Sequence, residues 1–367
     1  ANNLTLNLGL RYDVEIIKDI PDWPAGTDKN NFDPRIGFAW DPKGDQKWAI
    51  RGGIGHFTQQ HAIFTIVKGG VGGRNGLVTL SLNSTDPLFP TFPNTLPGFP
   101  PGAVLPARSI QEISPDLENE HSWNGSLGVQ HQIGARSNVA VDFNMNRGVK
   151  HGFLDMNAPA PIPKDQLNAA LSANPSAIVR TQAQADLTRP IVPGPNGFRH
   201  MDVLTNEGRS WYQGIRFSGA HRTTPLVITA SYTWSSAEDM LNHWFSPENS
   251  RDPESDRGPT GASTPHNLVT SFLWNIPGSR PGLGGWRLGL VTHHQSGAPY
   301  TIRYAGDPVG YGAGLGAACN ARGCQPSTPN GRNTARGMFI NYADLTLGKT
   351  FQLGEDRIEF RADAFNV

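Results

Sequence analysis

The sequence contains no long apolar run. A membrane-spanning helix needs roughly 18 or more consecutive apolar residues, and no stretch of the chain approaches that length. This excludes a helical membrane protein but not a membrane barrel, in which only alternate residues of each strand meet lipid. The first residues, ANNLTLNLGL, also lack the basic and apolar regions of a signal peptide. We therefore expect that a signal was removed or that the chain starts inside a longer protein.

The sequence also lacks excess charge and has little cysteine. Lys and Arg number 31, as do Asp and Glu, so the formal net charge is zero. A neutral chain is a poor general binder of polyanions, so no nucleic-acid partner is expected. The two cysteines, Cys319 and Cys324, stand in the segment ACNARGC within a Gly-rich loop. A small disulfide in an oxidising compartment is the preferred interpretation, and two free thiols are the alternative. No metal site is predicted there, because no His pair or further Cys lies nearby in sequence.

What the sequence does contain is alternation between apolar and polar residues. In the closing segment DRIEFRADAFNV, Ile358 and Phe360 begin an apolar face, while Arg357 and Glu359 begin a charged one. Eleven candidate strands of this kind cover residues 4–12, 32–41, 47–57, 122–132, 138–146, 209–220, 226–235, 266–276, 285–295, 343–351 and 356–367. Strands of globular proteins have about five or six residues, whereas about ten match a tilted span of a bilayer. The lengths of these segments therefore favour a membrane barrel.

The connections between these segments alternate in length along the whole chain. The short ones are 41–47, 133–137, 221–225, 277–284 and 353–357. The long ones are 14–31, 58–121, 149–208, 237–265 and 296–341. Tight periplasmic turns and long outer loops alternate in this way in outer-membrane barrels. Within the third long loop, residues 163–187 are predicted to form a helix that is interrupted near Pro175.

Tryptophan placement points in the same direction. Seven of the nine Trp lie in candidate strands or at their ends: Trp40, Trp48, Trp123, Trp211, Trp234, Trp274 and Trp286. Membrane barrels carry aromatic girdles at both interfaces. The alternative is that these side chains fill the core of a soluble sheet, but such a sheet rarely needs strands of ten residues throughout.

No motif predicts catalysis. The segment KGGVGGRNG (68–76) lacks the Gly-Lys-Ser/Thr ending of a phosphate-binding loop and is predicted to be a flexible loop. The segment HHQSG offers His293, His294 and Ser296, but alternation places the two histidines on opposite faces of one strand. A Ser/His hydrolase would also need an orienting acid. We predict no catalytic residue and no cofactor.

Two loop segments are weak candidates for binding. The segment NSRDPESDRGP (249–259) offers carboxylates that suit calcium, but it lacks a Gly-punctuated calcium loop, so solvation or pairing with the interleaved arginines is preferred. In MLNHWF, His243 and Trp244 lie in a long loop and are the weak candidates for ligand contact. They could equally pack the loop against its neighbours. No metal-binding set is predicted.

Taken in order, the strand segments resemble one family, the TonB-dependent outer-membrane receptors of the Oar-like type. The resemblance rests on NLTLNLGLRYD, NFDPRIGFAWDP, AIRGGIGHF, WNGSLGVQHQI, YQGIRFSGAHR, ITASYTWSSAED, QSGAPYTI, GRNTARG and ADLTLGKTFQLGEDRIEFRADAFNV. One departure is STPHN, where the family is expected to read Asp-x-x-His-Arg and only His266 is retained. The turn held by that Asp and Arg is therefore not expected to be the same here.

The resemblance implies an all-β, antiparallel transmembrane barrel of roughly 22 strands closed by a plug. Residues 1–367 would form the second part of the barrel, without the regulatory-like domain, the plug and the final strands. The apolar face of the last strand would meet lipid, and its charged face would meet the lumen or plug, where Arg pairs with Glu or Asp. If the N-terminus lies on the periplasmic side, every long loop lies on the outer side of the membrane. The odd number of candidate strands also favours a fragment, since single-chain bacterial barrels have even numbers.

The function implied by the resemblance is energised import, or binding at the cell surface, without enzyme activity. The expected partners are outer-membrane lipid, the plug of the same protein, the TonB complex acting through an upstream segment, and an unidentified extracellular ligand. Three alternatives remain open: a structural or adhesive surface barrel, an outer-membrane barrel enzyme with acid and base at the outer rim, and a soluble β-sandwich or propeller.

Overall fold

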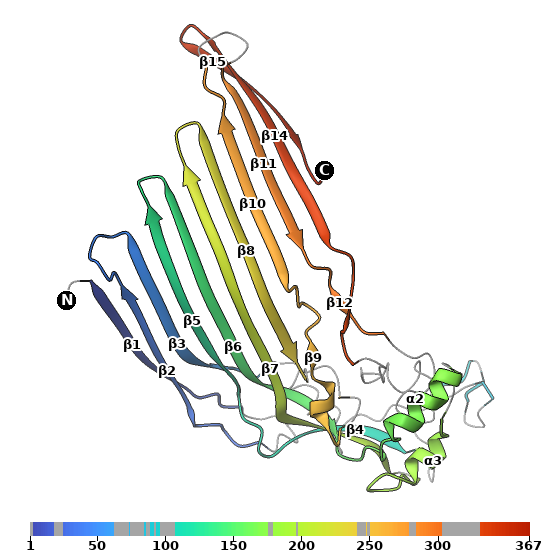
Figure 1. Cartoon of the computed structure of the whole chain (residues 1–367). Coiled ribbons are helices and arrows are strands. Elements are labelled where there is room, and N and C mark those ends of the chain that lie inside the picture. The colour runs from blue at the N-terminus through green and yellow to red at the C-terminus, as the bar shows by residue number, and fades with distance from the viewer. Residues whose placement is uncertain are drawn as a thin grey trace.

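The computed structural model describes residues 3–17, 25–61, 107–174, 179–195, 197–240, 250–278, 284–302 and 331–367, together with a few short pieces between them. One large sheet holds most of the regular structure of these residues (Figure 1). Eleven long strands follow one another across it in chain order, each antiparallel to the next. They coincide with the eleven segments predicted from alternation, and the all-β antiparallel prediction is confirmed.

The long strands are β1 Leu4–Asp13, β2 Asn31–Trp40, β3 Trp48–Gln59, β5 Glu120–Ile133, β6 Ser137–Asp155, β7 Phe198–Arg222, β8 Leu226–Asp239, β10 His266–Asn275, β11 Trp286–Gln295, β14 Ile340–Leu353 and β15 Asp356–Ala364. The sheet is open, with β1 and β15 at its two edges (Figure 1). Tight turns join the strands at one end. In the last of these, Gly354 has a φ of +66°, a conformation that favours glycine in a two-residue hairpin loop.

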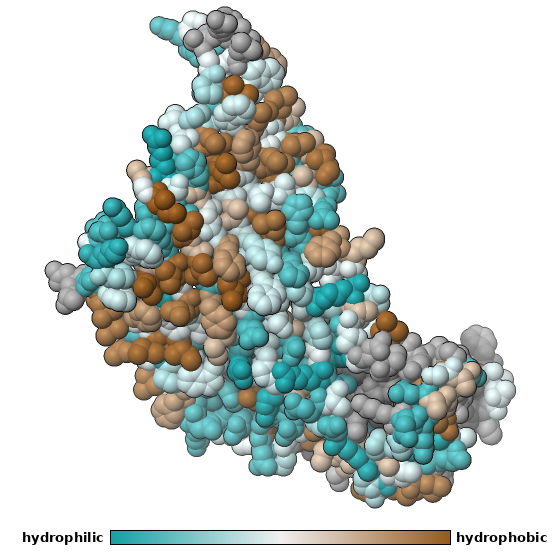
Figure 2. Space-filling view, viewed as in Figure 1, coloured by the Kyte–Doolittle hydropathy of each residue, from teal (hydrophilic) through white to brown (hydrophobic). Residues whose placement is uncertain are grey.

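One face of the sheet is apolar and uncovered, and we call it the outer face. Its cross-strand pairs include Leu8 with Ile36 and Ile36 with Ile54. Leu8 is 76% exposed and Phe360 is 64% exposed, because no second layer packs on the strands among the described residues. Figure 2 shows hydrophobic residues spread across the strands and hydrophilic residues gathered toward the loop end. An apolar face of this extent is stable against lipid rather than water.

The opposite face is polar, and we call it the inner face. On β15 it carries Glu359, which pairs with Arg287 at 3.3 Å and with Arg357 at 2.9 Å. Asp363 pairs with Arg361 at 2.9 Å and also accepts a hydrogen bond from a threonine of β14. The last strand thus has one apolar and one charged face, and its charges pair as the sequence predicted.

The seven tryptophans of the strands all lie on the outer face, at two levels. Trp40, Trp48, Trp274 and Trp286 stand beside the tight turns. Trp123, Trp211 and Trp234 lie toward the other end of their strands. This arrangement agrees with the predicted pair of aromatic girdles, which flank the apolar band of a membrane barrel.

The described parts of the long connections lie at the end opposite the tight turns (Figure 1). β6 and β7 continue beyond the other strands and pair as far as Asp155 with Asp202, past an irregularity between Lys150 and Gly152. The short β4, Arg108–Ile113, adds to β7 in parallel. Small strands also form here: β9 Gly258–Pro259, β12 Pro299–Tyr300 and β13 Ala335–Arg336.

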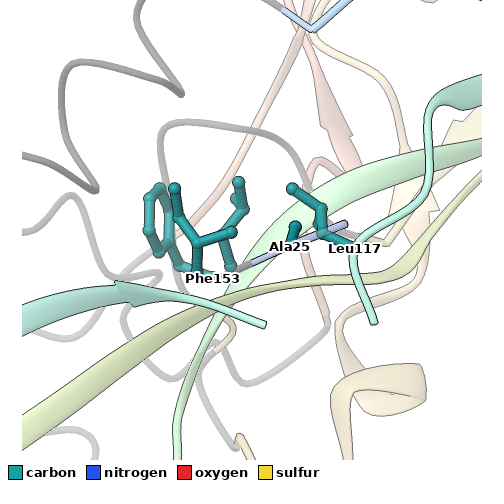
Figure 3. Close-up of a cluster of buried hydrophobic side chains, with 5 residues drawn as sticks. Ala25, Leu117 and Phe153 are labelled. Atoms are coloured by element: carbon teal, nitrogen blue, oxygen red, sulfur yellow. The ribbon is translucent and has the colours of Figure 1, made fainter. Parts of the chain in front are cut away.

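The main buried apolar cluster lies in this loop assembly rather than in the sheet. It contains Ala25, Ile113, Leu117, Phe153 and Leu204, and Figure 3 shows three of them facing one another from separate segments. A membrane barrel needs no core beneath its wall, since lipid covers the apolar face, whereas its loops in water must bury apolar side chains to hold a shape.

The predicted helix of residues 163–187 forms as two short helices. α2, Lys164–Ala173, follows Pro163, and α3, Gln182–Asp186, begins at a Thr181 capping box. Pro175, where an interruption was predicted, lies outside the described residues. Across the part of the chain that is described, no helix is long and apolar enough to cross a membrane.

Candidate functional site

The candidate functional site is the region where the inner face meets the loops. A hollow of about 610 Å³ lies there, and its inner-face lining includes Phe57, Glu120, Lys150, Ser210 and Tyr212. These residues come from β3, β5, β6 and β7, at the points where the strands approach the loops. A molecule held by the loops would meet the inner face here. The lining offers both charges, a hydroxyl and aromatic rings for contact with a polar ligand.

One polar cluster ties the first two long loops to the start of β5. A single carboxylate oxygen of Glu15 accepts the His61 backbone N–H at 2.9 Å, the His61 ring nitrogen at 2.7 Å and the Asn119 amide at 2.8 Å. Asn119 is buried, donates also to the Gln59 carbonyl and accepts from the Asn31 amide. Burial acts to raise the pKa of Glu15, but the His61 and Asn119 hydrogen bonds outweigh it and leave the pKa below its usual value.

A second cluster fastens the third long loop to the far ends of β6 and β7. Asp155 accepts from the His200 ring at 2.5 Å and from the Met201 backbone N–H at 3.0 Å. Arg189 lies 3.4 Å from the same carboxylate and 2.8 Å from Asp186. All three members Asp155, Arg189 and His200 are buried. The cluster therefore holds a buried charge network in which each residue has defined partners.

The hydrogen-bond partners in this cluster determine which ring nitrogen of His200 carries the proton. The Arg189 guanidinium lies 3.1 Å from Nε2 of His200 and can only donate, so Nε2 accepts and Nδ1 carries the proton toward Asp155. Asp155 lies 18 residues beyond Ser137 at the turn, past the loop-side tryptophans and outside the membrane span. Burial acts to raise the pKa of Asp155, but the hydrogen bonds from His200 and Met201 and the charge of Arg189 hold that pKa below its usual value.

A third cluster joins the last long loop to the end of β8. Arg332 is buried, forms an ion pair with Asp239 and donates to the Asp256 carbonyl at 2.9 Å. Asn333 donates to the Pro259 carbonyl at 2.8 Å. Four of the five long loops are thus locked to strand ends by buried polar side chains, which is the rigidity that a preformed binding surface requires.

Several residues predicted from sequence lie outside the described residues. These are the ligand candidates His243 and Trp244, the cysteines Cys319 and Cys324, and the glycine-rich segment 68–76 apart from Gly73. The disulfide and the two ligand contacts therefore stay predictions.

The two histidines of HHQSG do lie on opposite faces, as predicted. His293 is on the inner face, where it hydrogen-bonds to Tyr342 and lies 3.0 Å from the Asn267 side chain. His294 is on the outer face, 2.8 Å from Asn341. Ser296 is buried and accepts the His266 backbone N–H, and the His266 ring bonds instead to Tyr232 at 2.8 Å. These residues therefore form no joint nucleophile and base.

In the described part of the acidic segment 249–259, Asp252 and Glu254 are exposed to solvent, which agrees with the solvation alternative, and both arginines have partners outside the segment. Arg257 pairs with Glu238 of β8 at 2.9 Å, and Arg251 donates to the Ala158 carbonyl at 2.9 Å. Within the segment, Pro253–Asp256 forms a short 3-10 helix, labelled η1. Within the described residues, no group of three or more His, Cys, Asp or Glu side chains could hold a metal ion.

The three clusters were not predicted from the sequence. Their members lie far apart along the chain: His61 and Glu15 are 46 positions apart, and Asp155 and His200 are 45 apart. The available signal was the loss of alternation at the end of β6, where Gly152, Phe153, Leu154 and Asp155 are all buried. Such a loss marks where a strand leaves lipid and becomes packed by loops on both faces, but it does not identify the partners.

With this geometry in place, the chain can be assigned to a family. It belongs to the family described as outer membrane beta barrel domain, whose match covers residues 17–367. The protein is therefore an outer-membrane β-barrel protein of the Gram-negative type, and its uncovered outer face is the surface that meets lipid.

Solved structures share the fold. The chain is similar to the FrpB iron transporter of Neisseria meningitidis, F5-1 variant, with a TM-score of 0.51 and 11% identity over 100% of this chain and 39% of that one. The outer membrane transporter YddB of Escherichia coli has a TM-score of 0.50 and 11% identity, over 100% of this chain and 39% of that one. The siderophore receptor PirA of Acinetobacter baumannii has a TM-score of 0.50 and 14% identity, over 96% of this chain and 38% of that one. The chain thus spans less than two fifths of these proteins. No curated protein matches it in sequence.

Proposed function

We propose that the chain forms part of the wall and the outer loops of a TonB-dependent receptor of the Oar-like type, which captures a ligand outside the cell and imports it. The fold shared with an iron transporter, an outer-membrane transporter and a siderophore receptor supports this proposal. Iron and siderophores, which the names of two of those proteins give as their ligands, are one candidate ligand class for this protein. The protein has no enzyme activity in this proposal, and its long loops face outward.

The observation that carries the proposal is an unsatisfied donor on the inner face. Arg35 lies over the Phe57 ring at 4.3 Å, and its Nε is buried without a hydrogen-bond partner among the described residues. Beside it, a hollow of about 690 Å³ is lined by Asn7, Asn124 and Asn144. A buried donor without a partner costs about 1–3 kcal/mol, so the position of Arg35 favours a polar acceptor on an occupant of the hollow. A plug domain of the same full-length protein would supply one.

The open edges support a barrel larger than this chain. β1 and β15 each pair on one side only within the described residues. In lipid, every unpaired backbone group costs several kcal/mol, so both edges must pair with further strands. In this proposal residues 1–367 are one part of the wall, with a plug and a segment that contacts the TonB complex elsewhere in the protein.

Uptake by whole cells tests the import proposal. Cells with and without the gene for the full-length protein would be given labelled ferric siderophores, oligosaccharides or peptides, in the presence and absence of an uncoupler of the proton gradient. Import predicts accumulation that needs the gene and disappears with the uncoupler. Gene-dependent binding that the uncoupler leaves unchanged would instead support a structural or adhesive surface protein.

A further inference from the structure

A group of arginines lies on the outer face near its loop end. Arg147 of β6 stands directly between Trp123 of β5 and Trp211 of β7 in the cross-strand register. Arg209 lies two positions further along β7 on the same face, opposite Val149. The guanidinium of Arg257 stacks on the Trp211 ring at 4.1 Å. Three guanidinium groups are thus grouped around one tryptophan on the side of the sheet that meets lipid.

The position of Arg147 along its strand places it at a membrane interface. It lies ten residues beyond Ser137, where β6 begins at the tight turn (147 − 137). Ten residues of strand span about 33 Å, and a tilt of about 40° reduces this to a height of about 25 Å. That height equals the apolar band of a membrane barrel, about 25 Å. Arg147 therefore stands where the hydrocarbon of the loop-side leaflet gives way to headgroups.

The group carries more positive charge than the protein neutralises. Arg147 is exposed and forms no ion pair or hydrogen bond with any described residue. Arg209 donates to the backbone carbonyls of Asn206 and Gly208. Among the described residues, Arg257 alone of the three pairs with a carboxylate, that of Glu238 at 2.9 Å. An unpaired guanidinium next to hydrocarbon is stabilised by an anion at the headgroup level, and its planar fork fits a phosphate with two hydrogen bonds.

We propose that Arg147, flanked by Trp123 and Trp211 and supported by Arg209 and Arg257, binds a phosphate group of lipid A in the outer leaflet. The tryptophan rings fix the depth of the site and contact the lipid beside its headgroup. This inference needs the loops to face outward but is independent of import, since an adhesive barrel would have the same lipid-facing surface.

The test uses the full-length protein, extracted in mild detergent without endogenous lipid. Native mass spectrometry would count bound lipid A, the diphosphorylated glycolipid, against a dephosphorylated form and against phosphatidylglycerol. The variants are Arg147→Gln, Arg147→Lys and, as matched control, Arg136→Gln, which removes the same charge at an exposed turn. Heat-modifiable migration on a gel would show that each variant is folded.

The proposal predicts about tenfold weaker lipid A binding for Arg147→Gln, a smaller loss for Arg147→Lys and none for Arg136→Gln. Dephosphorylated lipid would bind the parent protein as weakly as lipid A binds Arg147→Gln. Equal binding by folded Arg147→Gln and parent would overturn the proposal. So would displacement of lipid A by an equal concentration of inorganic phosphate, or a preference for phosphatidylglycerol, because the site would then recognise a different source of phosphate.

Discussion

At the scale of single residues, Asp155 is the side chain on which the third long loop depends. It is buried and holds His200, the Met201 backbone and Arg189 at once. Asp155→Asn would leave Arg189 with only part of its compensating charge, at a cost of about 3 kcal/mol in local stability. Hydrogen exchange should then be more than about a hundredfold faster at Met201, with the strands of the wall unchanged.

Asp142→Asn is the matched control for this prediction. Asp142 pairs with Arg216 at 2.9 Å on the inner face, where their side chains are 29% and 53% exposed. An exposed pair of this kind contributes about 0–1 kcal/mol, so the control should change exchange little. Similar effects of the two substitutions would contradict the assigned role of the buried cluster.

The pH dependence of the loops follows from the same carboxylates. The pKa values of Asp155 and Glu15 lie below their ordinary 3.8 and 4.5 in the folded protein. Their stabilising contribution is therefore complete above those ordinary values and is lost as the pH falls through the lower, folded pKa values. The contribution of these two carboxylates to the protease resistance of the loops should be constant from about pH 7 to about pH 5 and fall below about pH 4. A Glu15→Gln, Asp155→Asn double variant should lack this contribution, and a double variant whose resistance falls below about pH 4 as steeply as that of the parent protein would contradict it.

At the scale of the elements, an arginine introduced on the outer face of a strand is expected to destabilise the protein more than one introduced on the inner face. Leu127 and Ser126 are neighbours in the middle of β5, on the outer and inner faces respectively. Leu127→Arg should destabilise the protein by about 2–4 kcal/mol, because the charge would lie in hydrocarbon. Ser126 lines the inner hollow, so Ser126→Arg should cost less than about 1 kcal/mol. Urea unfolding of the full-length protein in lipid vesicles measures both, and equal costs would contradict the assignment of the faces.

The strands that sequence could predict are those whose alternation is enforced by lipid. In β5, β8 and β15 every second residue meets the membrane, so the period of two appears in the sequence. The extension of β7 back to Phe198 was not predictable, because loops pack both of its faces there and the alternation ends. β4 was not predictable either, because it has six residues and depends on pairing with this extension. β12 and β13 have two residues each, which is too short for a pattern of alternation.

The polar clusters were beyond prediction for a related reason. Asn119 joins Glu15, His61 and Asn31, and its own sequence surroundings contain no signal for any of them. Which loops meet is decided by the order of strands around the wall and by the packing of the loops on one another. Sequence patterns report the environment of a residue, lipid or water, but not a contact between distant loops.

At the scale of the whole molecule, the arrangement of turns and loops predicts which parts can be reached from outside the cell. The long loops carry the buried clusters and the hollow, whereas the described residues at the other end form tight turns such as Gly354–Glu355. A single reactive cysteine can mark each end. Glu254 is exposed in the fourth long loop, and Glu355 is exposed in the last turn.

Labelling intact cells with a membrane-impermeant maleimide then tests the orientation. Glu254→Cys should be labelled, and Glu355→Cys should react only after the outer membrane is opened. The parent protein measures the background from Cys319 and Cys324. The two positions lie at opposite ends of the same sheet. If Glu355→Cys were labelled in intact cells and Glu254→Cys were not, the barrel would have the opposite orientation, with its tight turns outside the cell. The arginine group around Trp211 would then face the inner leaflet, and both the outward loops and the lipid A site would have to be abandoned together.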